Sequence, residues 1–184
     1  MAIFFLSSSS LVQAQTFKHD FLYKFGSFWS DVTTDGAFLY VTNSAYSQID
    51  KYDVSGVHQA SNWGGYGTAV GKLKQPMGIV RVGTNLYVAD TGNNRIQRFN
   101  SSTGVQDLSW GSYGASSGQF DAPQGIAVDS TQTYLFVADT NNNRIQAMVV
   151  SGGAVASIAG TLGTGINQFS SPKGIAVIGS SSPY

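Results

Sequence analysis

The sequence is organised as a repeat with a spacing of 47 to 49 residues. The segment Leu86-Tyr-Val-Ala-Asp-Thr-Gly-Asn-Asn-Arg-Ile-Gln97 returns 49 residues later as Leu135-Phe-Val-Ala-Asp-Thr-Asn-Asn-Asn-Arg-Ile-Gln146, and a weaker copy, Leu39-Tyr-Val-Thr-Asn43, lies 47 residues upstream. A second motif, Pro-x-Gly-Ile, begins at Pro76, Pro123 and Pro172. Such a fixed period means that one structural unit is copied along the chain, so the fold must be a stack or a ring of these units.

Within one unit the hydrophobic pattern is that of β-strands. Short apolar runs at 125–129, 134–138, 144–149 and 155–159 predict four antiparallel strands, the first of them an inner strand. Residues 140–143 (Thr-Asn-Asn-Asn) predict a hairpin turn, because Asn tolerates left-handed backbone. The chain also has 22 Gly and no Glu, a residue that helices use freely. We therefore predict an all-β fold.

Together the two motifs, Pro-x-Gly-Ile-Ala-Val and Val-Ala-Asp-Thr-x-Asn-Asn-Arg-Ile-Gln, resemble the NHL repeat over about residues 21 to 178. The resemblance implies a β-propeller of four-stranded NHL-type blades, typically six to a ring, which serves more often as an interaction platform than as an enzyme. Three full blades are expected to begin near Asp31, Gly78 and Gly125, with an outer strand at 21–25 before them and an inner strand at 174–178 after them. The chain would hold about three to four blades, a partial ring relative to a six-bladed propeller.

An open row of blades leaves strand edges and apolar blade faces uncovered at both ends. Two interpretations stay open: a fragment of a longer protein, or a chain that self-associates through its open blade edges. Residues 1–15 resemble a leader or weak signal peptide ahead of a propeller segment at 16–184, because Val12-Gln-Ala14 resembles a cleavage site, although no Lys or Arg precedes Lys18. That leader is too short to span a bilayer. A signal peptide would place the protein outside the cell or at the cell surface.

The repeat contains two pairs of opposite charges, which flank the predicted hairpin turns: Asp90 with Arg95, and Asp139 with Arg144. We expect each pair to meet across its turn in a charge-assisted hydrogen bond, single or bidentate, that locks the turn; presentation of both charges to a ligand is the alternative. In the upstream copy, Asn43 and Gln48 stand at the equivalent positions. Both charges are replaced there together, as expected for a local pair in which neither charge is tolerated alone.

Two groups of residues are candidates for ligand binding. Trp63 and Trp110, with Tyr66 and Tyr113, recur at the repeat period and either stack on a sugar or base or pack between adjacent blades. The densest basic cluster, around one predicted inter-blade loop, consists of Lys72, Lys74 and Arg81. These side chains either contact RNA phosphates or are simply solvated. Because 10 Lys and Arg residues balance 10 Asp residues, nucleic acid is not the expected partner.

No catalytic constellation is evident in the sequence, which lacks a Gly-rich phosphate loop, a Gly-x-Ser-x-Gly elbow and any Cys. His19 and His58 are not spaced as metal ligands, whereas Asp35 and Asp129 end inner strands and either ligate calcium near the central channel or form turns. We predict no cofactor, no metal, and a non-catalytic platform for protein or carbohydrate binding. The alternatives are a propeller lyase or hydrolase with a metal in the channel, and RNA binding through a basic loop face.

Overall fold

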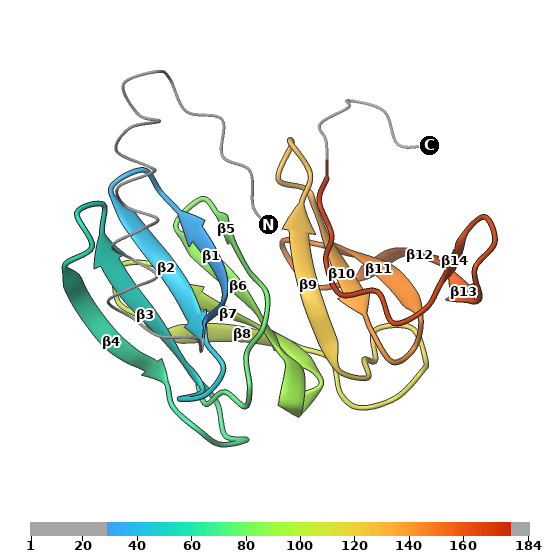
Figure 1. The fold of residues 1–184 in the computed structure, drawn as a ribbon, viewed down its shortest axis with the longest axis horizontal. Coiled ribbons are helices and arrows are strands. Elements are labelled where there is room, and N and C mark those ends of the chain that lie inside the picture. Colours follow the sequence, from blue (N-terminus) through green and yellow to red (C-terminus); the bar gives the residue numbers. More distant parts are fainter. Residues whose placement is uncertain (1–28, 178–184) are drawn as a thin grey trace.

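The computed structural model describes residues 29–177, which form three four-stranded antiparallel sheets and one two-stranded sheet (Figure 1). The first sheet consists of β1 (Trp29–Thr34), β2 (Phe38–Asn43), β3 (Gln48–Asp53) and β4 (His58–Gly64). The second consists of β5 (Ile79–Val82), β6 (Asn85–Asp90), β7 (Arg95–Asn100) and β8 (Gln106–Trp110). The third consists of β9 (Pro123–Val128), β10 (Tyr134–Asp139), β11 (Arg144–Val149) and β12 (Val155–Ala159). Each sheet follows the chain order, as in a propeller blade. The predicted fold class is confirmed, and we call the sheets blades 1, 2 and 3.

The inner strands of the three blades gather at the centre of the molecule. β1 packs on β5 and β5 packs on β9, and the blades spread from them so that β4 and β12 lie at opposite sides (Figure 1). The backbones of neighbouring inner strands touch: the Gly78 N–H donates to the Gln124 carbonyl at 3.0 Å. The three blades are therefore consecutive sectors of one ring.

The second strand is the most buried strand of each blade, and in blade 2 it is covered on both faces by neighbouring blades. In β6, Leu86 to Asp90 are all buried, which accounts for the unbroken apolar run Leu-Tyr-Val-Ala. One core cluster joins residues of blade 1 to residues of blade 2, among them Tyr40, Ile49 and Leu86, and the other joins blade 2 to blade 3. The hydrophobic cores therefore lie between blades, so no blade buries its apolar faces alone.

A threonine hydrogen bond recurs at each junction between blades. Thr42 Oγ1 donates to the Met77 carbonyl at 2.6 Å and Thr91 Oγ1 donates to the Pro123 carbonyl at 2.6 Å. Thr140 Oγ1 likewise donates to the Pro172 carbonyl at 2.8 Å. Each blade thus fixes the start of the next inner segment through a side chain of its own second strand or of the turn that follows it.

The segment after blade 3 departs from the prediction. We expected an inner strand at 174–178, but residues 172–177 form no strand, although they lie against β9 as β9 lies against β5. An inner strand needs a second strand to pair with, and no hairpin follows within residues 29–177. The predicted outer strand at 21–25 and the leader at 1–15 lie outside the described residues. No helix in the described part of the chain is long and apolar enough to cross a membrane.

Candidate functional site: the loop face

Three loops join the outer strand of one blade to the inner segment of the next, and we call them loop 1 (65–75), loop 2 (112–122) and loop 3 (161–171). Each follows a glycine with positive φ: Gly64 (+111°), Gly111 (+96°) and Gly160 (+102°). A Cβ on Gly111 would lie 2.5 Å from the Phe120 ring, so only glycine lets this ring fill the space beneath loop 2. Parallel bridges close loops 1 and 2, and the short strands β13 (Thr161–Leu162) and β14 (Gln168–Phe169) close loop 3. The three loops therefore share one conformation.

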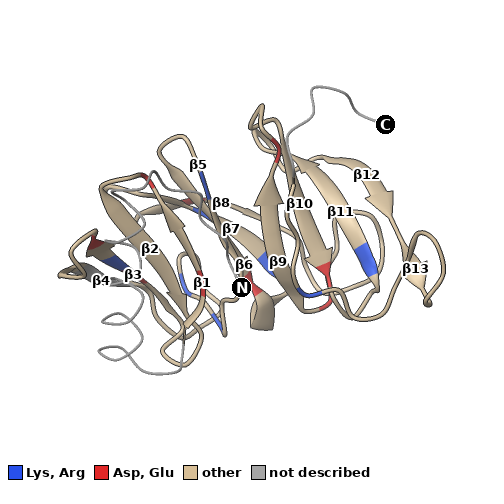
Figure 2. Cartoon of the chain, turned by 45° about the horizontal axis from the view of Figure 1, so that its top comes forward, with Lys and Arg blue, Asp and Glu red and all other residues tan. Residues whose placement is uncertain are grey.

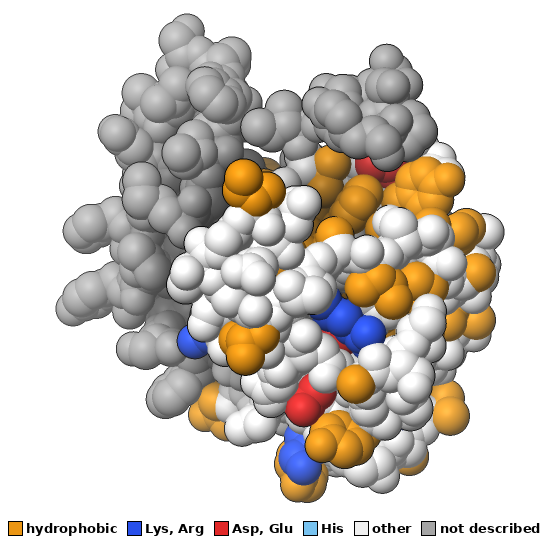
Figure 3. Space-filling view, turned by 90° about the vertical axis from the view of Figure 1, so that its right-hand side faces the viewer, with side chains coloured by type: hydrophobic (Ala, Val, Ile, Leu, Met, Phe, Trp, Pro, Cys, Tyr) orange, Lys and Arg blue, Asp and Glu red, His pale blue; other side chains and the backbone are white. Residues whose placement is uncertain are grey.

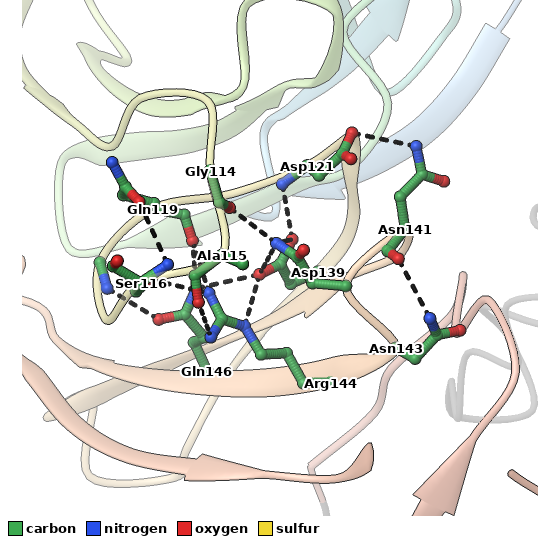
Figure 4. Close-up of polar contacts among 12 residues, drawn as sticks. Gly114, Ala115, Ser116, Gln119, Asp121, Asp139, Asn141, Asn143, Arg144 and Gln146 are labelled. Atoms are coloured by element: carbon green, nitrogen blue, oxygen red, sulfur yellow. Dashed lines mark hydrogen bonds and ion pairs between the residues drawn. The ribbon is translucent and has the colours of Figure 1, made fainter. Parts of the chain in front are cut away.

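Blade 3 holds loop 2 through a cluster of polar side chains around Asp139 (Figure 4). Its Oδ2 accepts hydrogen bonds from Arg144 Nε at 2.7 Å, Asn142 Nδ2 at 3.0 Å and Gln146 Nε2 at 3.1 Å. Its Oδ1 accepts the backbone N–H of Asp121 at 2.8 Å. The carboxylate is fully buried, so these donors replace its lost hydration.

The donors around Asp139 also bind the backbone of loop 2. Arg144 donates through Nη1 to the Ala115 carbonyl at 2.7 Å, and through Nη2 to the carbonyls of Ser116 and Gln119, both at 2.9 Å. Gln146 Nε2 donates to the Gln119 carbonyl at 2.6 Å, and Asn142 Nδ2 donates to the Gly114 carbonyl at 2.8 Å. We call this arrangement, in which one buried carboxylate orients donors toward a loop backbone, a clamp.

Blade 2 holds loop 1 with an equivalent clamp. Arg95 Nε, Asn93 Nδ2 and Gln97 Nε2 donate to Asp90 Oδ2 at 2.7, 2.9 and 2.9 Å. The three side chains reach the carbonyls of Ala69, Lys72 and Gly67 in loop 1. In both clamps only Nε of the arginine binds the aspartate, because the terminal nitrogens bind the loop. The ion pair is therefore not bidentate.

Blade 1 lacks the charge pair, as predicted, but keeps a buried carboxylate. Asn43 and Gln48 do replace Asp90 and Arg95, but a buried carboxylate is retained by Asp50, which lies where Gln97 stands in blade 2. Gln48 Nε2 and Asn43 Nδ2 donate to Asp50 at 2.6 and 3.3 Å, and His58 Nε2 lies 3.9 Å from Asp50 Oδ1. The acid and the amide have exchanged strands, so both charges of the pair are replaced as predicted while a buried carboxylate remains on β3.

The clamped loops present exposed aromatic side chains at equivalent positions. Tyr66 in loop 1 is 73% exposed and Tyr113 in loop 2 is 70% exposed. Val70 in loop 1 and Tyr46, in the adjoining turn of blade 1, are also exposed. The sequence pointed to Tyr66 and Tyr113 only through their period; their exposure depends on the loop conformation. We call loops 1 and 2, together with the adjoining turn of blade 1 at residues 44–47, the loop face.

The predicted tryptophans do not contribute to this surface. Trp63 stacks on Tyr40 and Trp110 stacks on Tyr87, at ring-centroid distances of 6.2 and 5.5 Å. A Cβ on Gly153 would lie 2.4 Å from the Trp110 ring, so Trp110 of blade 2 fills a space that only glycine leaves open in blade 3. Both tryptophans are partly buried between blades and do not form open stacking platforms.

The predicted basic cluster is divided by the fold. Lys72 and Lys74 lie in loop 1, where Lys72 Nζ donates to the Gly64 carbonyl at 3.0 Å and the Lys74 N–H donates to Asp90 Oδ1 at 2.7 Å. Arg81 lies on β5 opposite Leu86, toward the other end of the blade, and its N–H donates to Thr33 Oγ1. Charges of both signs are spread over the three blades (Figure 2), so these three residues do not make one phosphate-binding surface.

Asp35 and Asp129 each organise the turn after an inner strand. Burial acts to raise the pKa of Asp35, but hydrogen bonds from the Phe38 N–H and the Tyr40 hydroxyl outweigh it and hold the pKa below its usual value. Burial likewise opposes hydrogen bonds to Asp129, from the Thr131 hydroxyl and the Tyr134 N–H among others, and the pKa is again lowered. Among residues 29–177, no three His, Cys, Asp or Glu side chains come together as a metal site.

Comparison with known proteins identifies the fold alone. No family model matches the chain, and no curated protein matches it. Solved structures do match, including Kuenenia stuttgartiensis hydrazine synthase, with 15% identity and a TM-score of 0.62 over 80% of this chain and 38% of that one. Virginiamycin B lyase from Staphylococcus aureus gives 17% identity and a TM-score of 0.55 over 79% and 44%. The WD40 repeats of RRP9 give 13% identity and a TM-score of 0.57 over 71% and 38%.

The chain thus spans about two fifths of the length of these structures, which are β-propellers. At identities this low the likeness carries the fold and no activity. The NHL assignment stays a prediction from the repeat motifs. The comparisons and the three blades together establish that residues 29–177 fold as part of a β-propeller.

Proposed function

We propose that the chain is a non-catalytic binding platform whose ligand is a polypeptide held on the loop face. The observation that carries the proposal is the equivalent exposure of Tyr66 and Tyr113 on neighbouring clamped loops. Tyrosine combines a large apolar ring with a hydroxyl and has few rotatable bonds, so immobilising it on binding costs little entropy. A loop fixed beforehand by a clamp reduces that cost further.

The composition of the loop face favours a polypeptide over a carbohydrate. Sugar recognition needs polar side chains free to bind hydroxyl groups, but the Asn, Arg and Gln donors of the clamps already bind loop carbonyls. Besides Tyr66, loop 1 exposes the apolar Ala69 and Val70 together with Thr68, Lys72 and Gln75. Tyrosine with apolar neighbours and few charges is typical of the centre of a protein interface.

The test is a peptide selection with a matched control. A displayed random-peptide library would be selected on the full chain, and the affinity of each selected peptide would be measured for the wild type and for a Tyr66→Ala, Tyr113→Ala double variant. Because a central interface tyrosine contributes about 1–2 kcal/mol, we expect binding at least about tenfold weaker in the double variant.

Tyr134→Ala is the matched control. Tyr134 is also exposed, but it lies at the start of β10, at the opposite end of that strand from the Asp139 clamp. We expect this variant to bind the selected peptides as the wild type does. Peptides that bind the double variant and the wild type equally would show that the loop face is not the binding surface.

A further inference from the structure

The side of blade 3 that faces away from blade 2, which we call its open side, resembles the sides of blades 1 and 2 on which the next blades pack. Residues 171–177 already lie in the place of a fourth inner strand: the Ser171 N–H donates to Asn143 Oδ1 at 2.9 Å, as the Ala122 N–H donates to Asn94 Oδ1 at 2.8 Å. A Cβ on Gly125 would lie 2.4 Å from the Lys173 carbonyl, as a Cβ on Gly78 would from the Gln124 carbonyl. The first segment of a fourth blade is therefore in place, but residues 29–177 contain no further strand of that blade.

Loop 3 shows what those missing strands would supply. It has the conformation of loops 1 and 2, and the Gly163 N–H donates to the Phe169 carbonyl at 3.1 Å as the Gly114 N–H donates to the Phe120 carbonyl. Within the described residues, however, no clamp faces it. The carbonyls that correspond to the four bound in loop 2 belong to Gly163, Thr164, Gly165 and Gln168.

The apolar surface around loop 3 is uncovered in the same way. Leu73 and Phe120, which fill the space beneath loops 1 and 2, are fully buried, whereas the equivalent Phe169 is partly exposed. Ile158 of β12, with Leu162 and Ile166 of loop 3, is also exposed. Apolar side chains lie across this side of the molecule with few charged groups among them (Figure 3).

We infer that the open side of blade 3 is a docking surface for the hairpin of a further β-blade that carries the set Asp-x-x-Asn-x-Arg-x-Gln. Asp90, Asn93, Arg95 and Gln97 form this set in blade 2, and the same spacing recurs from Asp139 to Gln146. The incoming hairpin clamps loop 3 and covers Phe169. Its first strand pairs with residues 174–177 in the register in which Ile126 of β9 faces Val137 of β10.

Blade 1 of a second copy is a poor occupant of this surface. At the Gln position of the set it carries Asp50, an acceptor that would face the Gln168 carbonyl where Gln97 and Gln146 donate to the carbonyls of Lys72 and Gln119. Tyr46 stands at the position of the clamp asparagine, and Gln48 at that of the arginine. An acceptor placed against an acceptor is unfavourable, so the repeat itself discriminates against head-to-tail closure by blade 1.

The probe is a labelled synthetic peptide with the sequence of residues 129–159, which contains β10, β11 and β12 of this chain. Mixed with the full-length protein, it is expected to bind saturably by fluorescence anisotropy and to slow amide exchange of Gly163 but not of Gly67. The same peptide with Arg144→Ala and Gln146→Ala keeps the strand pattern but lacks two clamp donors, and it is expected to bind at least about tenfold more weakly.

Three results would overturn the inference. The first is no binding up to the solubility limit of the peptide, and the second is equal binding of both peptides. The third is a discrete dimer of the chain alone, if its mass by light scattering falls in the Phe169→Asp variant but not in the Tyr113→Ala variant. The Tyr66→Ala, Tyr113→Ala double variant should bind the peptide as the wild type does. Failure of this inference is thereby separated from failure of the proposed function.

Discussion

Replacing Asp139 by Asn is expected to lower the free energy of unfolding by about 3–5 kcal/mol, the cost of leaving one partner of a buried ion pair without the other. Arg144 is 11% exposed and Asp139 is fully buried, so water cannot solvate the arginine that remains. The amide also places an NH2 group where the carboxylate accepts hydrogen bonds from Asn142 and Gln146. Urea unfolding followed by tryptophan fluorescence measures the change.

Asp107→Asn is the matched control for that variant. Asp107 also pairs with an arginine at 2.8 Å, but its side chain is 48% exposed and Arg98 is 22% exposed. Exposed pairs contribute about 0–1 kcal/mol, so we expect little change in stability. Equal losses in the two variants would contradict the role given to the clamp. Asp139→Asn combined with Arg144→Leu should recover part of the loss, since it removes the unpaired charge.

The second large effect is expected from Gly78→Ala, which should lower the free energy of unfolding by about 2–3 kcal/mol through overpacking. The added Cβ would lie 2.4 Å from the Gln124 carbonyl oxygen and 3.0 Å from Ile126 Cγ2. The nearest obstacle is backbone rather than a flexible side chain, and the Gly78 N–H is itself bonded to that carbonyl. The inner strands of blades 2 and 3 would have to separate.

Gly152→Ala provides the comparison for Gly78. A Cβ at Gly152, in the turn between β11 and β12, meets nothing within 4 Å, and its φ is not positive. We expect this variant to unfold at the same urea concentration as the wild type. If Gly78→Ala were equally neutral, the conclusion that neighbouring inner strands pack backbone against backbone would be wrong.

The strands and hairpins could be predicted because each is specified locally. The run from Leu135 to Gln146 contains a strand, its turn and the start of the next strand, and the turn requires left-handed backbone only at Asn143 (φ +55°). Both charge pairs lie across such a turn, so their meeting also follows from local order. The strand expected at 174–178 was wrong because a strand depends on a partner, which the pattern of one segment does not contain.

The clamps could not be predicted in full because their other half is loop backbone. Nothing in the residue types of loop 2 indicates that the carbonyls of Ala115, Ser116 and Gln119 converge on one guanidinium. The exchange in blade 1 was missed for a related reason. A position-by-position comparison of the repeats shows a neutral Asn43 where blade 2 carries Asp90, whereas the compensating Asp50 lies on the adjacent strand.

We expect the clamps, rather than the loops' own hydrogen bonds, to hold loops 1 and 2 in place. Gly67, Gly114 and Gly163 provide an internal comparison, since each donates its N–H across its loop at 3.0 to 3.1 Å and, within residues 29–177, only the first two loops are clamped. Native-state hydrogen exchange measures the opening of each loop. We expect the amides of Gly67 and Gly114 to exchange as slowly as those of β6 and β10, and the amide of Gly163 to exchange much faster. Equal exchange rates at the three glycines would show that the clamps do not hold the loops.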